Sequence, residues 1–113
     1  VQLAACSTIV SGADYDEAFS LATAFLAAGA RTAYGSMWTV PDRYTSRLMF
    51  MVHHYRRVEG CTPAVALHRA RRWSRDPHRV PPDGMPPALA ASWRSALPSD
   101  DPVAWAGCLH VGA

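Results

Sequence analysis

The first residues that could carry out chemistry lie at the start of the chain, where VQLAACST places Cys6 directly after an apolar run. The run, Val1–Ala5, is typical of a short buried strand. A thiol at the end of such a strand can act as a nucleophile if a histidine promotes its thiolate and backbone N–H groups hold the resulting oxyanion. Free cysteine is also among the most buried residue types, so spacing alone favours a packed, inert Cys6.

A second group of candidate site residues follows the next predicted strand. Residues 31–40, RTAYGSMWTV, have the length and aromatic content of a buried strand that ends near Trp38. Ligands collect at the carboxyl ends of strands in sheets built from strand–helix crossovers. We therefore expect Trp38, Val40 and Asp42 to face the same rim, where they could form the wall of a pocket beside Cys6. The alternatives are a core aromatic for Trp38 and, as the preferred interpretation of Asp42, a cap of the following helix.

The elements between these residues predict an α/β arrangement. Asp14 and Glu17 have the spacing of a capping box. Residues 16–28 are apolar almost all round, which indicates a helix packed on more than one side, and Gly29 supplies its end. Strand, helix and strand in that order predict a parallel, right-handed crossover.

Two further helices are predicted after Pro41. The first has an apolar stripe of helical period and ends at Gly60, with Arg43, Arg47, His54 and Arg57 off the stripe. The stripe consists of Tyr44, Leu48, Met51, Tyr55 and Val58. The second begins with Thr62 as N-cap and Pro63 at the first helical position, and places Ala66, Ala70 and Trp73 on one face.

The last third of the chain is less regular. Residues 76–87 hold five prolines, too many for a helix interior, so they predict an irregular loop or insertion. A short helix is expected over Ala88–Leu97, and VAWAGCLHVGA is expected to form one more core strand after the turn SDDP.

Composition limits the classes of protein that remain. The 113 residues suffice for one domain, half of them are hydrophobic, and no apolar run is long enough to span a bilayer. Three cysteines without a C-x-x-C pair suggest neither a disulfide framework nor a thiolate zinc site, and the adjacent His53 and His54 point to different sides of a helix. We expect a soluble, cytoplasmic protein with no cofactor and no metal.

Charge supports a different class of function. All eleven basic residues are arginine, and nine of them lie between Arg43 and Arg79 against only Glu59 and Asp76. If the predicted helices present these arginines on one face, the domain could bind an acidic partner or nucleic acid. We rank this hypothesis lower because such charges usually form the wet side of amphipathic helices. Nucleic acid is the less favoured partner, since few aromatic residues there are placed to stack bases.

Several motifs in the same order resemble the carboxyl half of a CHAT domain, the caspase-like module often joined to tetratricopeptide repeats. They are LAACST, DEAFSLATAFLAAGART, GSMWTVPD with a following Thr, EGCTPAVAL, and DPVAWAGCLHVG. The last is similar to the family's closing strand H-P-x-x-W-A-x-F-x-L-x-G. Only the proline-rich loop falls outside the resemblance.

The resemblance implies a three-layer caspase-like fold with a mostly parallel sheet, and a cysteine peptidase of clan CD that cleaves peptide or protein substrates. Cys6 matches the nucleophile of the family's S-A-C-x-T motif, and Trp38 and Asp42 match its W-x-V-x-D segment beside the substrate pocket. The family's catalytic histidine, in an H-G motif, belongs before Val1, and none of the five histidines here is assigned to it.

Departures from the family pattern favour a second hypothesis. Ile9 stands where the family usually has glycine and Ala4 replaces the commoner serine, so the loop around Cys6 is altered. A β-branched residue does not adopt the positive φ that glycine allows. The alternative is therefore a catalytically inactive, CHAT-like module that binds protein partners.

The chain is expected to be a piece of a longer polypeptide, since it begins with Val1 inside an apolar run. Residues 1–113 are interpreted as the carboxyl part of the domain, with the remaining strands and the histidine upstream. The resemblance implies that tetratricopeptide repeats belong to the same parent protein. Alone, this part is expected to be inactive and to expose a strand edge.

Overall fold

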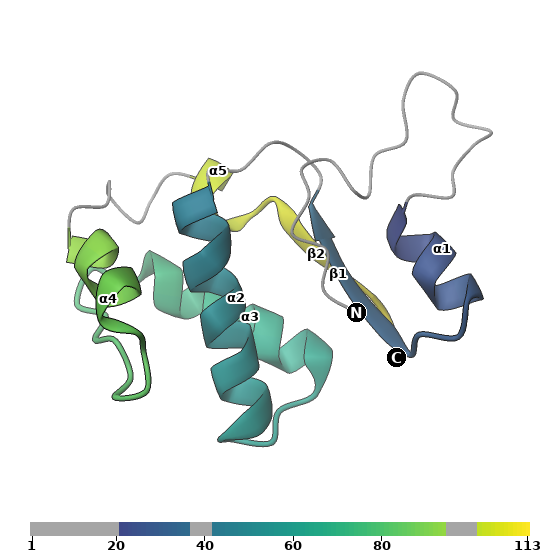
Figure 1. Cartoon of the computed structure of the whole chain (residues 1–113), viewed down its shortest axis with the longest axis horizontal. Coiled ribbons are helices and arrows are strands. Elements are labelled where there is room, and N and C mark those ends of the chain that lie inside the picture. Colours follow the sequence, from purple (N-terminus) through teal and green to yellow (C-terminus); the bar gives the residue numbers. More distant parts are fainter. Residues whose placement is uncertain (1–20, 37–41, 95–101) are drawn as a thin grey trace. The chain divides into compact units, whose positions relative to one another are not determined.

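The computed structural model describes residues 21–36, 42–94 and 102–113 (Figure 1). These residues fall into two compact units. The strand unit holds α1 (Leu21–Ala27), β1 (Thr32–Ser36) and β2 (Cys108–Gly112). The helical unit holds the other four helices, α2 (Asp42–Arg57), α3 (Pro63–Arg75), α4 (Pro87–Arg94) and α5 (Pro102–Trp105). The predicted strand at Val1–Ala5, and with it the parallel crossover, lies outside the described residues.

Gly29 ends α1, as its position in the sequence predicts. Its φ of 105° is in the left-handed region that glycine adopts without steric cost. The N–H of Gly29 donates to the carbonyl of Leu26, and the N–H of Ala30 donates to the carbonyl of Phe25, both at 3.0 Å. This pair of bonds is a Schellman motif, which satisfies carbonyls left open at the end of the helix.

The two described strands pair antiparallel, in a register that sets Thr32 opposite Gly112 and Ser36 opposite Cys108. Ala33 and Tyr34 are both buried, with 0% and 6% of their surface exposed. Consecutive residues of a strand point to opposite faces of the sheet, so both faces of β1 are covered. The prediction of a buried strand is thereby confirmed for residues 32–36, whereas β2 is half-buried along most of its length.

A close backbone contact joins the end of β2 to the start of β1. A Cβ atom at Gly112 would lie 2.5 Å from the carbonyl oxygen of Arg31, and φ at Gly112 is 102°. The N–H of Ala113 donates to that same oxygen at 3.0 Å. Only glycine fits this approach, which gives a physical reason for the glycine that closes the motif DPVAWAGCLHVG.

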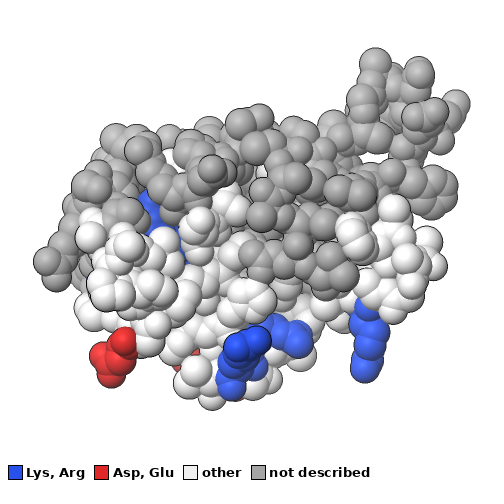
Figure 2. Space-filling view, in the orientation of Figure 1, with Lys and Arg blue, Asp and Glu red and all other residues white. Residues whose placement is uncertain are grey.

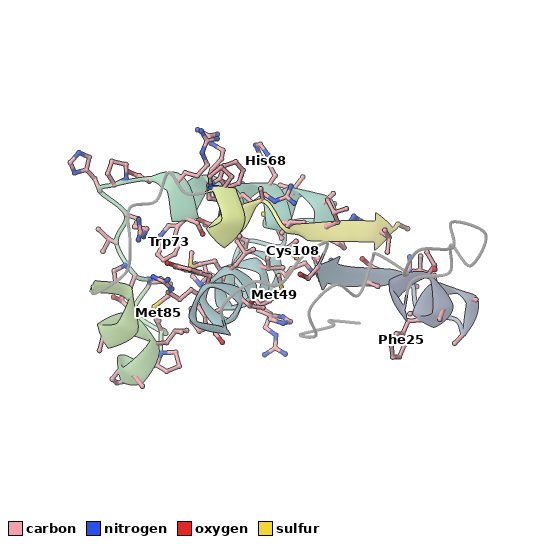
Figure 3. All side chains as sticks on the ribbon, turned by 90° about the horizontal axis from the view of Figure 1, so that it is seen from above. Phe25, Met49, His68, Trp73, Met85 and Cys108 are labelled. Carbon is pink, nitrogen blue, oxygen red and sulfur yellow. The ribbon has the colours of Figure 1, made fainter. Side chains whose placement is uncertain are left out.

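The outer side of α1 departs from the prediction that this helix packs on more than one side. Phe25 is 36% exposed, and Ala24 and Ala27 are exposed as well (Figure 3). Leu26 is the residue that approaches the strands, since its side chain lies 3.0 Å from the Cβ position of Gly112. Among the side chains described on α1, Leu26 is half-buried against the strands, and apolar residues on the other side are exposed.

Helices α2 and α3 pack against each other and contain the core of the helical unit. The predicted stripe on α2 is buried at Tyr44, Leu48 and Met51. Two further residues of α2, Met49 and Val52, are also buried, so its apolar face is wider than the stripe. Val58 is 72% exposed because α2 has already ended at Arg57.

Arg47 corrects the sequence prediction, since it was placed off the stripe and is only 5% exposed. Residues three apart on a helix are neighbours, so Arg47 lies beside Tyr44 on the inner side. Its guanidinium stands over the Tyr44 ring, 5.1 Å from the centroid. A planar, delocalised cation can stack on an aromatic face in this way while its stem packs in the core.

The predicted start and inner face of α3 are confirmed. The Thr62 hydroxyl accepts from the N–H of Val65 at 3.4 Å, and Pro63 occupies the first helical position. Ala66, Leu67 and Ala70 are buried. Trp73, predicted on the same face, is half-buried.

After α3 the chain is irregular as far as Pro86, as the prolines predict. The short helix expected over Ala88–Leu97 is confirmed as far as Arg94, and α4 begins one residue earlier than expected, at Pro87. The loop is tied to α3 because the indole N–H of Trp73 donates to the carbonyl of Val80 at 3.1 Å. The predicted final strand is shorter than expected, since Pro102–Trp105 forms one helical turn. The fixed φ of proline suits the first position of a helix. None of the described helices is both long and apolar enough to cross a membrane.

Candidate functional site

Three of the four candidate site residues, Cys6, Trp38 and Val40, lie outside the described residues. The fourth, Asp42, is the first residue of α2, and only its backbone is described. The structure therefore describes only the elements that precede and follow the predicted pocket wall in the sequence. Residues 37–41 connect the end of β1 at Ser36 with the start of α2, so they follow the carboxyl end of a buried strand.

The neighbour of β1 at this end is the start of β2. Cys108 opposes Ser36, and both residues are half-buried. Cys108, labelled in Figure 3, and Cys61 are both half-buried and outside any disulfide bond. In the strand pair, Cys108 opposes the last residue of β1.

A polar contact across the strand pair was not anticipated from the sequence. The Nε2 atom of His110 lies 2.6 Å from the hydroxyl oxygen of Thr32, and the His110 ring is 5.5 Å from the Tyr34 ring. Because His110 opposes Tyr34 and is diagonal to Thr32, these contacts hold the two strands in register. The contact could not be predicted from the sequence, because His110 and Thr32 are 78 positions apart and meet only in one strand register.

Arginines and aromatic rings contact one another at several points of the helical unit. The closest is Arg75 over Trp105, at 4.7 Å from guanidinium to ring centroid, followed by Arg79 over Trp73 at 5.8 Å. Arg79 also donates to the backbone carbonyl of Asp76 at 3.2 Å. Burial lowers the pKa of Arg79, while Asp76 acts in the opposite direction.

Arg69 links α3 to the segment that follows α2. It forms an exposed salt bridge with Glu59 and lies over the Tyr55 ring, 6.0 Å from its centroid. Burial, followed by the negative charge of Glu59, raises the pKa of the Tyr55 hydroxyl. Exposed ion pairs contribute little stability, so this contact orients Arg69 more than it strengthens the fold.

The arginines do not share one face, which was the condition for the broad basic surface considered from the sequence. Arg47 is buried in the core, whereas Arg56 and Arg57 are exposed at the end of α2. On the face shown in Figure 2, basic side chains appear in separate places, some at the lower edge and one between grey atoms at the upper left, and acidic side chains appear at the lower left. Burial, followed by the charges of Arg57 and Arg56, lowers the pKa of His53.

Within residues 21–36, 42–94 and 102–113, no group of three or more His, Cys, Asp or Glu side chains could hold a metal ion. The polar features of the described part of the chain are thus a cross-strand histidine contact and several arginine–aromatic pairs.

Comparison with known proteins identifies the family. The family model of the CHAT domain matches residues 1–113. No curated protein and no solved structure matches the chain. The family match covers every element described above and the segment around Cys6. The chain therefore belongs to the CHAT domain family.

Proposed function

We propose that this chain is the carboxyl part of a caspase-like cysteine peptidase domain with Cys6 as its nucleophile. The observation that carries the proposal is the CHAT family match over the whole chain, together with the A-C-S-T motif at Ala5–Thr8. The proposed domain has three layers, with a mostly parallel sheet between helices. The burial of both faces of β1 supports this layered arrangement, because a sheet covered on both sides needs a layer on each.

In the proposed reaction, the Cys6 thiolate attacks the carbonyl carbon of a peptide bond and forms a C–S bond. The carbonyl oxygen becomes an oxyanion, which the backbone N–H of Cys6 stabilises by donating to it. Collapse of this intermediate breaks the C–N bond, and a histidine located upstream of this chain protonates the leaving amine. Water then hydrolyses the thioester, releasing the new carboxylate and restoring the thiol.

The pocket for the peptide is proposed at residues 37–42. Trp38, Val40 and Asp42 would border the substrate, since they follow the carboxyl end of β1. In the parent protein, the upstream strands would complete the domain, and tetratricopeptide repeats would be joined to it. The proposed setting is the cytoplasm, where cysteines remain reduced.

A catalytically inactive binding module is the second candidate, and Ile9 is the residue that favours it. Replacement of the family's usual glycine by a β-branched residue removes access to positive φ beside the nucleophile. A reshaped loop would misplace the donors for the oxyanion while leaving the surface able to hold a protein partner.

The test uses the parent protein, including the region before Val1, and a peptide library read by mass spectrometry for new amino termini. Cys6→Ala should abolish cleavage, because no other group supplies the nucleophile. Cys61→Ala is the matched control and should cleave as the unmodified protein does, since Cys61 lies on the connection between α2 and α3.

A third variant separates the two candidate functions. If the loop limits a working peptidase, Ile9→Gly should increase cleavage without changing which bonds are cut. Absence of cleavage in both the parent and Ile9→Gly, with the fold intact by circular dichroism, would refute the peptidase and leave the binding module.

A further inference from the structure

Helix α3 separates an apolar inner side from a basic outer side. Its buried residues are Ala66, Leu67 and Ala70. Three exposed basic residues, His68, Arg72 and Arg75, follow one another at spacings of four and three on the opposite side. We call these three the basic stripe. Figure 3 shows His68 projecting outward from α3, on the side away from Met49 of α2.

The basic stripe has no acidic counterpart on its own helix. Residues 63–75 contain four arginines and one histidine but no Asp or Glu. Glu59 is occupied by Arg69, and the Asp76 carboxylate accepts from the N–H of His78 at 2.9 Å. Among the described residues, no ion pair or side-chain hydrogen bond involves His68 or Arg72.

Like charges three and four positions apart on a helix repel each other, so Arg72 and Arg75 weaken the helix through this contact. The helix dipole offsets part of this repulsion, because both arginines lie in the last turn of α3. His68 extends the stripe toward the start of the helix with a further hydrogen-bonding side chain. A negatively charged partner would remove the repulsion between Arg72 and Arg75.

Arg75 is presented in a form suited to carboxylates. Its guanidinium stacks over Trp105 at 4.7 Å, and the residue remains exposed. Stacking occupies one face of the planar group and leaves its N–H edge available for bidentate bonds to a carboxylate. The ring also restricts the rotamers of Arg75, which reduces the entropy lost on binding.

The aromatic residues around the stripe favour a peptide over nucleic acid as the partner. Single-stranded nucleic acid is bound by stacking of bases on exposed rings. In the helical unit, arginines lie over the rings of Trp105, Trp73 and Tyr55. Trp73 also donates its indole N–H to the loop, so these rings serve the protein's own contacts.

From this geometry we propose that the basic stripe of α3 is a docking surface for an acidic peptide segment. From His68 to Arg75 the stripe covers eight residues, about 10 Å along the helix. It therefore accommodates a partner with three or so carboxylates at that length. This surface does not depend on Cys6 or on the peptidase reaction.

The test measures binding of a fluorescein-labelled hexaglutamate peptide to the whole chain by fluorescence anisotropy, with hexaglutamine as the uncharged reference. The double variant Arg72→Gln/Arg75→Gln removes two charges from the stripe. Arg56→Gln/Arg57→Gln is the matched control, because it removes the same charge from the last turn of α2. Circular dichroism verifies that both variants keep their helix content.

The proposal predicts that Arg72→Gln/Arg75→Gln weakens hexaglutamate binding about tenfold, whereas the control double variant changes it less than about twofold. Cys6→Ala should bind as tightly as the unmodified chain, so the result is independent of the proposed peptidase. Equal losses in the two double variants would overturn the proposal, since net charge would then explain the binding. Tighter binding of a single-stranded hexanucleotide, lost in Arg72→Gln/Arg75→Gln, would also overturn it in favour of a nucleic-acid surface.

Discussion

The helical unit and the strand unit hold their elements together in different ways. In the helical unit, α2 and α3 each bury an apolar face that can be read from helical periodicity, centred on residues such as Leu48, Val52 and Ala66. In the strand unit, close backbone approach at Gly112 and the cross-strand contact of His110 fix the strand pair, while α1 leaves Phe25 exposed. The stability of the helical unit thus depends mainly on buried side-chain volume, and that of the strand unit depends mainly on backbone geometry.

The largest effect is expected from Gly112→Ala in the strand unit. The new Cβ would meet the Arg31 carbonyl oxygen at 2.5 Å and would require a residue other than glycine at a φ of 102°. We expect a loss of about 3 kcal/mol in the free energy of unfolding, measured by chemical denaturation.

Two other glycines provide the matched series. Gly60 has a φ of 65° with open space around it, so Gly60→Ala should cost about 1 kcal/mol. Gly84 has open space and no positive φ, so Gly84→Ala should change stability by less than about 0.5 kcal/mol. Equal effects at Gly112 and Gly84 would show that the close approach does not hold the strands.

Val52→Ala tests the corresponding role of volume in the helical unit. Val52 is fully buried, and its truncation should cost about 2 kcal/mol through lost burial and the cavity left behind. Val58→Ala, at a residue 72% exposed, is the control and should cost less than about 0.5 kcal/mol. In Val52→Ala, hydrogen exchange should show a larger loss of protection in α2 and α3 than in β1 and β2. An equal loss of protection in both units would contradict the distinction between them.

The smallest effect concerns pH and the end of α2. The pKa of His53 is lowered from 6.5 in the folded state, so the unfolded chain binds its proton more readily. Stability should therefore be lost as pH falls below 6.5 and should be regained above it. His53→Gln should lessen the fall in Tm on acidification, and Arg57→Gln should lessen it partly by removing one cause of the shift. An unchanged pH dependence in His53→Gln would contradict this assignment.

Sequence periodicity predicted the helical unit well, because capping and amphipathic spacing are local signals. Thr62, Pro63 and the buried alanines of α3 lie where the pattern placed them. Arg47 was missed, since residue type suggested solvent while its position beside Tyr44 placed it in the core. The exposed side of α1 was also missed, because an apolar surface does not indicate which neighbours are present to cover it.

The candidate site was predicted mainly from the resemblance to the CHAT domain family. Membership of the chain in this family is confirmed. The burial of β1 agrees with the predicted strand, and α2 begins at Asp42. The pocket itself stays a prediction, because Cys6, Trp38 and Val40 lie outside the described residues. The contact of His110 with Thr32 depends on strand register, which spacing along the chain does not determine.

The pH dependence of Cys6 alkylation tests the central claim most directly. Iodoacetamide labelling of the parent protein is followed by mass spectrometry at each cysteine, with Cys6→Ala as control and the half-buried Cys61 and Cys108 as internal references. A catalytic Cys6 should react with an apparent pKa well below about 8.5, because a nearby histidine promotes the thiolate. A Cys6 that stays unreactive at every pH in the folded parent would contradict the account and identify its thiol as a packing residue.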